Sequence, residues 1–111
     1  MDPLDQYRNI IVDILKELAV RRYSHGDIKN QAVIDRQGDH YLVMSQGWDK
    51  LERIHGTLLH IDIIDGKLWI NRDGTEDGIA NRLVEQGVPK NKIVLAFHAP
   101  EIRKHTDFAV A

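Results

Sequence analysis

Histidine and aspartate side chains in the middle of the chain are the residues whose types and spacing could do chemistry. His60 and Asp62 stand two positions apart in a stretch where polar and apolar residues alternate. Such a pair could serve as a general base and the group that orients it. However, we expect the side chains at positions i and i+2 of a strand to lie well apart. No nucleophile is expected beside them, since the hydroxyl of Thr57 is predicted to project from the other face. The pattern therefore favours a cross-strand polar ladder or a binding surface over acid–base catalysis.

Metal and cofactor binding are not predicted. No HExxH motif is present, and no two of the six histidines stand one helical turn apart. His55 and His60 differ in strand parity, so without a bulge they point to opposite faces. The chain has no cysteine, which excludes disulfides, thiolate metal sites and a cysteine nucleophile. The sequence therefore predicts no catalytic residue, no cofactor and no metal ligand.

Charge and hydropathy indicate which kinds of partner the protein binds and where in the cell it is expected. The formal net charge is −2, and basic residues are interleaved with acidic ones along most of the chain. Proteins that bind nucleic acid usually carry a basic stripe that displaces counterions from phosphates. Apolar runs are too short to span a bilayer, and the acidic N-terminus lacks the order of a secretory signal. We expect a cytoplasmic protein without membrane contact or direct nucleic-acid binding.

The elements before the His60 region follow from periodicity and turn residues. Asp2-Pro3 begins a helix with an amphipathic stripe that runs to about Arg22. Residues 24–27 then form a loop, and two strands are predicted at Gln31–Asp35 and His40–Gln46. The glycine of Gln37-Gly38 supplies a positive φ to the turn between them, and Gly47-Trp48-Asp49 ends the second strand.

A hairpin positions His60 and Asp62. Asp65-Gly66 is a strong two-residue turn signal between strands predicted at Arg53–Ile64 and Lys67–Asn71. Counting from this turn pairs Ile64 with Lys67, Ile63 with Leu68, Asp62 with Trp69, Ile61 with Ile70 and His60 with Asn71. One face then carries the core residues Leu59, Ile61, Ile63, Leu68 and Ile70, and the other carries His60, Asp62, Lys67, Trp69 and Asn71.

The last third of the chain returns to this sheet. Asp73-Gly74-Thr75 is expected to cap a second helix, with Glu76 and Asp77 in its first turn. Gly87 is expected to end this helix. Lys92–His98 then reads as a fifth strand, parallel to a neighbour and covered on both faces. Ala99–Ala111 is a tail with apolar anchors at Phe108 and Val110.

The fold class predicted from these elements is α+β, in a single domain over residues 1–111. An N-terminal helix precedes a four-stranded antiparallel meander of two hairpins, and a helix and a fifth strand follow. The helices are expected to pack on one sheet.

The ordered set of these residues resembles the XisI family of excision controlling factors over essentially the whole chain. The resemblance rests on Gly47-Trp48, Arg53-Ile54-His55-Gly56, His60-Ile61-Asp62, Gly66-Lys67-Leu68-Trp69-Ile70, Thr75, Ile79-Ala80, Leu83, Gly87-Val88-Pro89, Ile93-Val94-Leu95, Phe97, Pro100, Arg103 and Thr106–Ala111. It implies a non-enzymatic factor controlling programmed excision of a DNA element in the heterocysts of cyanobacteria. The companion it implies is XisH, a protein with a nuclease-like fold.

We therefore expect a regulatory protein that acts through protein–protein contact. Its interaction residues are His60, Asp62, Lys67, Trp69 and Asn71, and the partner is an XisH-like protein or a second copy of the chain. Two alternatives stay open. One is antitoxin-like restraint of the nuclease-like partner, and the other is a small-ligand or acid–base enzyme site on His60, Asp62 and Trp69. A walled pocket that also includes Arg53 would favour the enzyme, and a flat exposed face would favour the partner. A further question is whether the first helix covers this face.

Overall fold

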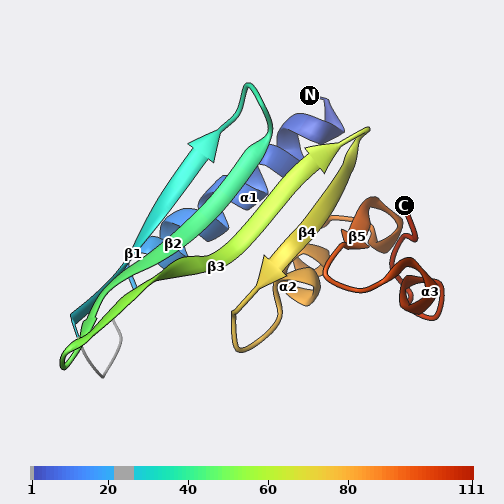
Figure 1. The fold of residues 1–111 in the computed structure, drawn as a ribbon. Helices are drawn as coiled ribbons and strands as arrows, with labels where there is room; N and C mark the ends of the chain where they lie inside the picture. Colours follow the sequence, from blue (N-terminus) through green and yellow to red (C-terminus); the bar gives the residue numbers. More distant parts are fainter. Residues whose placement is uncertain (1, 22–26) are drawn as a thin grey trace.

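The first helix, the four strands, the second helix and the fifth strand follow one another in the predicted order, and a short helix that was not predicted lies in the tail (Figure 1). The computed structural model describes residues 2–21 and 27–111. The elements are α1 (Pro3–Ala19), β1 (Asp27–Asp35), β2 (His40–Asp49), β3 (Glu52–Ile64), β4 (Lys67–Asp73), α2 (Ile79–Glu85), the 3-10 helix η1 (Lys90–Lys92), β5 (Ile93–Leu95) and α3 (Pro100–Arg103). None of the helices in these residues is long and apolar enough to cross a membrane.

All the strands belong to one five-stranded sheet in the order β1-β2-β3-β4-β5. The first four strands form an antiparallel meander, and β5 pairs with β4 in parallel. α1 lies behind β1 to β3 in Figure 1, and residues of α1 and α2 share one core cluster with the sheet. The predicted α+β fold class, with helices on one sheet, is thus confirmed.

The helix α1 begins where the sequence predicts and ends earlier. The Asp2 carboxylate accepts a hydrogen bond from the Leu4 main-chain N–H at 3.0 Å, and Pro3 occupies the first turn. The helix ends at Ala19 rather than near Arg22. Of the loop predicted at 24–27, residues 24–26 lie outside the described residues, and Asp27 already belongs to β1.

The core lies between the sheet and the two longer helices. Buried side chains of α1 and α2 meet the predicted core face of the β3–β4 hairpin, and every one of its five residues is buried. This cluster contains Ile11, Leu15, Leu18, Tyr41, Val43, Leu59, Ile61, Ile63, Leu68, Ile70, Ile79 and Leu83. The face carrying His60 and Asp62 is therefore the face that α1 does not cover.

Polar contacts join α1 to the β1–β2 hairpin. Arg8 makes a two-pronged ion pair with Asp39 in the hairpin turn, with nitrogen–oxygen distances of 2.8 and 3.0 Å. The buried Tyr41 donates its hydroxyl to the same carboxylate at 2.9 Å. Toward the other end of α1, the Asn30 side chain donates to the Leu18 carbonyl at 3.0 Å. These contacts set the helix along one face of β1 and β2.

Two predictions about the first hairpin are wrong. The positive φ of its turn belongs to Asp39, at 58°, and not to Gly38. Gly47 does not end the second strand, since β2 continues to Asp49 and β1 begins four residues before Gln31 to pair with it. A Cβ at Gly47 would lie 1.8 Å from the Asp27 carbonyl oxygen, so glycine lets the two backbones approach closely.

Two β-bulges interrupt the pairing of β3 with its neighbours, and one of them alters the predicted register. The Asp65-Gly66 turn is confirmed, with φ of 51° and 78°, and so are the four pairs nearest to it. His60, however, opposes Arg72, because the register shifts between His60 and Ile61 and leaves Asn71 as the extra residue. A second shift lies between β2 and β3, where Leu58 is the extra residue.

The C-terminal third departs from prediction at three points. α2 begins at Ile79 with Gly78 as its N-cap residue, so the predicted cap at residues 73–75 is wrong and Glu76 and Asp77 lie before the helix. The Asp73 carboxylate nevertheless accepts the Ile79 N–H at 2.8 Å. β5 is parallel and buried as predicted but spans only Ile93–Leu95, since the chain turns at Ala96. In the tail, Phe108 packs on the core, whereas Val110 is exposed.

Candidate functional site

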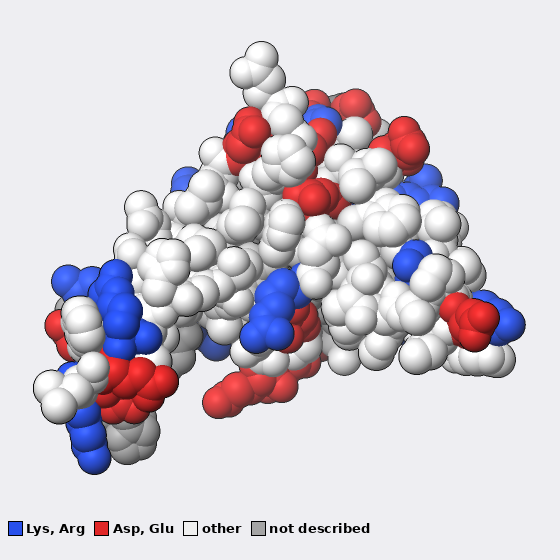
Figure 2. Space-filling view, viewed as in Figure 1, with Lys and Arg blue, Asp and Glu red and all other residues white. Residues whose placement is uncertain are grey.

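The sheet face opposite α1 carries the candidate site. We call this surface the open face: the side chains on β1 to β4 that point away from the helices, among them Val33, Leu42, Met44, Thr57, His60, Asp62 and Trp69. No described element lies in front of β1 to β3 in the view of Figure 1. In the same view, most of the surface over these strands is uncharged (Figure 2). The open face is thus an exposed, largely uncharged sheet surface.

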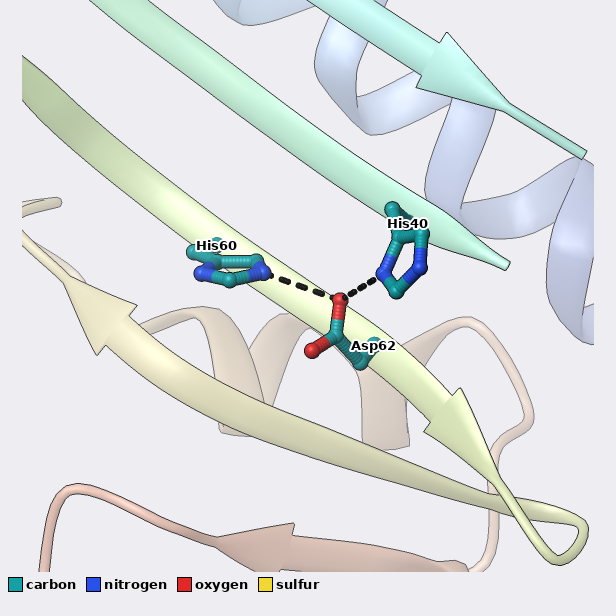
Figure 3. Close-up of side chains that lie close together, drawn as sticks. All are labelled: His40, His60 and Asp62. Atoms are coloured by element: carbon teal, nitrogen blue, oxygen red, sulfur yellow. Dashed lines mark hydrogen bonds and ion pairs between the residues drawn. The ribbon is translucent and has the colours of Figure 1, made fainter. Parts of the chain in front are cut away.

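A His–Asp–His cluster occupies the end of this face near the Asp65-Gly66 turn (Figure 3). Cross-strand pairing places His40 of β2 directly opposite Asp62 of β3. The Asp62 Oδ1 atom lies 2.8 Å from His40 Nδ1 and 2.9 Å from His60 Nε2. An ionised carboxylate only accepts hydrogen bonds, so both ring nitrogens donate to this oxygen.

The cluster carries its own electrostatic signature. The hydrogen bond to Asp62 raises the pKa of His40 above its usual value, and the charge of the carboxylate adds to this effect. Burial alone would raise the pKa of Asp62, but the hydrogen bonds from His40 and His60 outweigh it and lower that pKa. The carboxylate therefore stays ionised, and His40 is more easily protonated than a free imidazole.

The close approach of His60 and Asp62 contradicts the expectation that they stand apart. The His60 imidazole is long enough to lean along the strand and reach a carboxylate two residues away. Asn71 joins them, because its side-chain amide donates to Asp62 Oδ2 at 3.1 Å. Three of the five predicted interaction residues therefore form one connected group.

The bulge at Leu58 also corrects the predicted faces of two residues. Thr57 opposes Met44 and His55 opposes Gln46, which places both on the open face with His60. The Thr57 hydroxyl lies 3.4 Å from the Met44 sulfur. Counting alternate positions along the strand placed both residues on the face opposite to His60. That prediction is wrong because an extra residue in the strand reverses the alternation beyond it.

Trp69 and Lys67 border the cluster rather than join it. Trp69 opposes Asp62 and is half-buried, with the Arg103 guanidinium carbon 5.6 Å from a ring centroid. Lys67 donates to the main-chain oxygen of Ala111 at 2.5 Å. The C-terminal segment therefore covers the β4 end of the open face and leaves β1 to β3 exposed.

Arg53 does not contribute to a pocket around His60. It lies at the start of β3, where its guanidinium sits 5.4 Å from the ring centroid of Trp48. Arg53 instead lines a shallow depression together with Ser45, Ile54, His55, Gly56, Thr57 and Leu58. Among the described residues, Arg53 therefore lines a depression that includes neither His60 nor Asp62.

His40 is the member of the cluster that the sequence pattern did not reveal. It begins β2 and stands 20 positions before His60, so only the β2–β3 register brings them together. Counting from the turn pair Asp49–Glu52 would place His40 opposite Ile61, and the extra residue Leu58 moves it opposite Asp62. The bulge has no residue signature in the sequence, so this register could not have been counted.

Comparisons with known proteins agree with this fold. The family model described as XisI protein matches residues 1–110. A crystal structure of a XisI-like protein from Anabaena variabilis ATCC 29413 is 37% identical with a TM-score of 0.88, over 97% of this chain and 99% of that chain. The fdxN element excision controlling factor XisI of the same organism is 34% identical with a TM-score of 0.83, over 99% and 100%. No curated protein matches the chain.

Proposed function

The chain belongs to the XisI family, and we propose that it is a regulatory factor that acts by contact with a partner protein and catalyses no reaction itself. The structurally similar excision controlling factor supports a role in controlling the excision of a DNA element. The partner we propose is an XisH-like protein with a nuclease-like fold.

The observation that carries this proposal is the open face. A sheet face without a covering helix normally exposes polar side chains, but here Leu42, Met44 and the 42% exposed Val33 stand among the histidines. An apolar centre with aromatic and polar groups around it is typical of a protein interface. The predicted residues His60, Asp62, Trp69 and Asn71 lie along one side of this surface, and Lys67 lies at its margin.

The charge pattern favours a protein over DNA as the direct partner. Binding to duplex DNA draws its affinity from lysine and arginine contacts to phosphates. The chain has 15 basic and 17 acidic residues, and the view of the open face in Figure 2 shows no basic stripe across it. Any effect on DNA excision would then pass through the partner, either as activation or as restraint of its nuclease-like domain.

Co-expression with an XisH-like protein tests the proposal. We expect the two proteins to co-purify as a stable complex, and the same bait with charge placed on the open face, Leu42→Asp, to lose the partner. Failure of the wild-type pair to associate in size-exclusion chromatography would contradict the proposal. If light scattering instead shows a dimer of this chain that Leu42→Asp dissociates, the open face binds a second copy and the XisH assignment is wrong.

Trp69→Ala separates a binding role of the indole from a folding role. Trp69 is not fully buried, so its removal should cost the fold less than the roughly 3–5 kcal/mol typical of a buried tryptophan. If it contacts the partner, truncation should weaken association by about 2 kcal/mol or more. Thermal melts beside a pull-down distinguish the two roles, since a large loss of melting temperature in the free protein would end the interface assignment.

A further inference from the structure

The His–Asp–His cluster brings three metal-ligating atoms together on the open face. His40 Nδ1, His60 Nε2 and one Asp62 carboxylate oxygen all lie within 4.8 Å of one another. They come from two adjacent strands. The exposed fraction of the side chain is 56% for His40, 31% for His60 and 16% for Asp62. The atoms therefore face solvent from one side and rest on the sheet from the other.

We propose that His40, His60 and Asp62 bind one divalent transition-metal ion of the zinc class. This inference goes beyond the proposed function and does not depend on it, since the ligands all belong to this chain. Two imidazoles and a carboxylate suit zinc and its neighbours in the first transition row. Magnesium and calcium prefer sites built from oxygen atoms, which this cluster does not offer.

Small side-chain movements suffice to accommodate the ion. Zinc bonds of about 2.0–2.1 Å in a tetrahedron place the ligand atoms about 3.3 Å apart. The present separations of Asp62 Oδ1 from the two ring nitrogens are 2.8 and 2.9 Å. Each imidazole would lose the proton from its ligating nitrogen and keep a proton on its other ring nitrogen. The ion would then replace the two shared protons as the link between the side chains.

The surroundings of the cluster resemble those of a built metal site. The Asn71 amide donates to Asp62 Oδ2, which fixes the carboxylate plane and leaves Oδ1 directed at the histidines. Such partners of the ligands orient them and strengthen metal binding. The sheet provides three ligands from one side, so the fourth position points away from it. Water or a side chain from a partner protein could fill that position.

Metal titrations of the whole chain test this site. We expect ZnCl₂ to bind with one ion per chain in calorimetry. CoCl₂, used as a spectroscopic probe, should give the visible absorption bands of a low-symmetry, four-coordinate centre. In nitrogen-15 NMR spectra, ZnCl₂ should shift the imidazole signals of His40 and His60 and leave those of His55 unchanged.

Matched variants assign the ligands. His40→Gln and His60→Gln should each weaken zinc binding by about tenfold or more, and Asn71→Ala by a smaller factor. The control is His55→Gln, which removes an imidazole from the strand and the face that carry His60 and leaves the cluster intact. Because all four side chains are at least partly exposed, circular dichroism melts should show that the variants fold.

Two results would overturn the proposal. One is a titration in which ZnCl₂ fails to saturate at one ion per chain or shifts all the histidine signals alike. The other is a loss of affinity in His55→Gln equal to that in His40→Gln. Either would mean that the cluster is a hydrogen-bonded ladder that holds β2 to β3, and that zinc binds this protein only through scattered surface histidines.

Discussion

The two faces of the sheet are built on different principles. On the face that α1 and α2 cover, apolar side chains of β2, β3 and β4 are buried to 8% exposure or less, and together with the helices they form one cluster. These side chains are Tyr41, Val43, Leu59, Ile61, Ile63, Leu68 and Ile70. On the open face the same strands carry histidines, Thr57 and half-buried apolar residues. The first face is explained by folding alone, because apolar burial is the main force that holds a small domain together. The second needs another explanation.

Polar groups show the same contrast. On the covered side, Arg8 and Asp39 or Asn30 and Leu18 join the helix to the sheet. On the open side, the His40–Asp62–His60 cluster joins only neighbouring strands, which backbone hydrogen bonds already hold together. Groups whose removal should leave the architecture intact are the ones to examine for function, and substitutions on each face can test whether the contrast holds.

The largest effect is expected on the covered face. Leu59→Ala removes a fully buried side chain between the sheet and the helices and leaves a cavity. We expect a loss of about 2–5 kcal/mol in the free energy of unfolding. Urea denaturation monitored by circular dichroism measures it. A loss below that seen for open-face variants would remove the distinction between the two faces.

The turn that sets the register of both faces comes next. Gly66 has a φ of 78°, a region that β-branched residues rarely adopt, although a Cβ at this position would meet only open space. Gly66→Val should therefore cost about 1–3 kcal/mol through backbone strain alone. An unchanged denaturation midpoint would show that the turn can adopt another conformation, and Gly66→Asn, which tolerates positive φ, is the matched control.

The ion pair between α1 and the first hairpin gives a pH dependence. The hydrogen bond from Arg8 lowers the pKa of Asp39 below its usual 3.8. A lowered folded-state pKa contributes stability that is present above the unfolded-state pKa and is lost as the pH falls through the folded-state pKa. Asp39→Asn should cost about 1–2 kcal/mol at neutral pH and flatten the loss of stability on acidification. Equal acid sensitivity in both proteins would place that loss elsewhere.

A small effect is expected from charge on the open face. Met44→Lys places an ammonium group at the centre of this surface, where the aliphatic part of the side chain can still lie along the sheet. We expect the free energy of unfolding to change by less than about 1 kcal/mol. The same urea titration applies, and a loss comparable to that of Leu59→Ala would mean that the open face is part of the folding core.

The difference between the faces also decides what could be predicted from the sequence. Apolar alternation and the Asp65-Gly66 turn locate the covered face of β3 and β4, because a one-residue slip there would bury His60 and Asp62. The open face depends on two bulges, at Leu58 and Asn71, that no local pattern marks. The bulge at Leu58 decides that Thr57 and His55 share the face of His60. His40 completes the cluster from another strand, so the pattern of the β3–β4 hairpin alone does not predict its contact with Asp62.

If the open face exists for a partner, charge placed on it should weaken binding of an XisH-like protein, and the same charge elsewhere should not. Met44→Lys lies on the open face, and the control Val20→Lys makes the same kind of change at a 78% exposed residue beyond α1, in the opposite layer. We predict that calorimetry finds binding weakened about tenfold or more by Met44→Lys and unchanged by Val20→Lys. Equal affinities for the wild type and Met44→Lys, or a loss confined to Val20→Lys, would contradict a binding role for the open face.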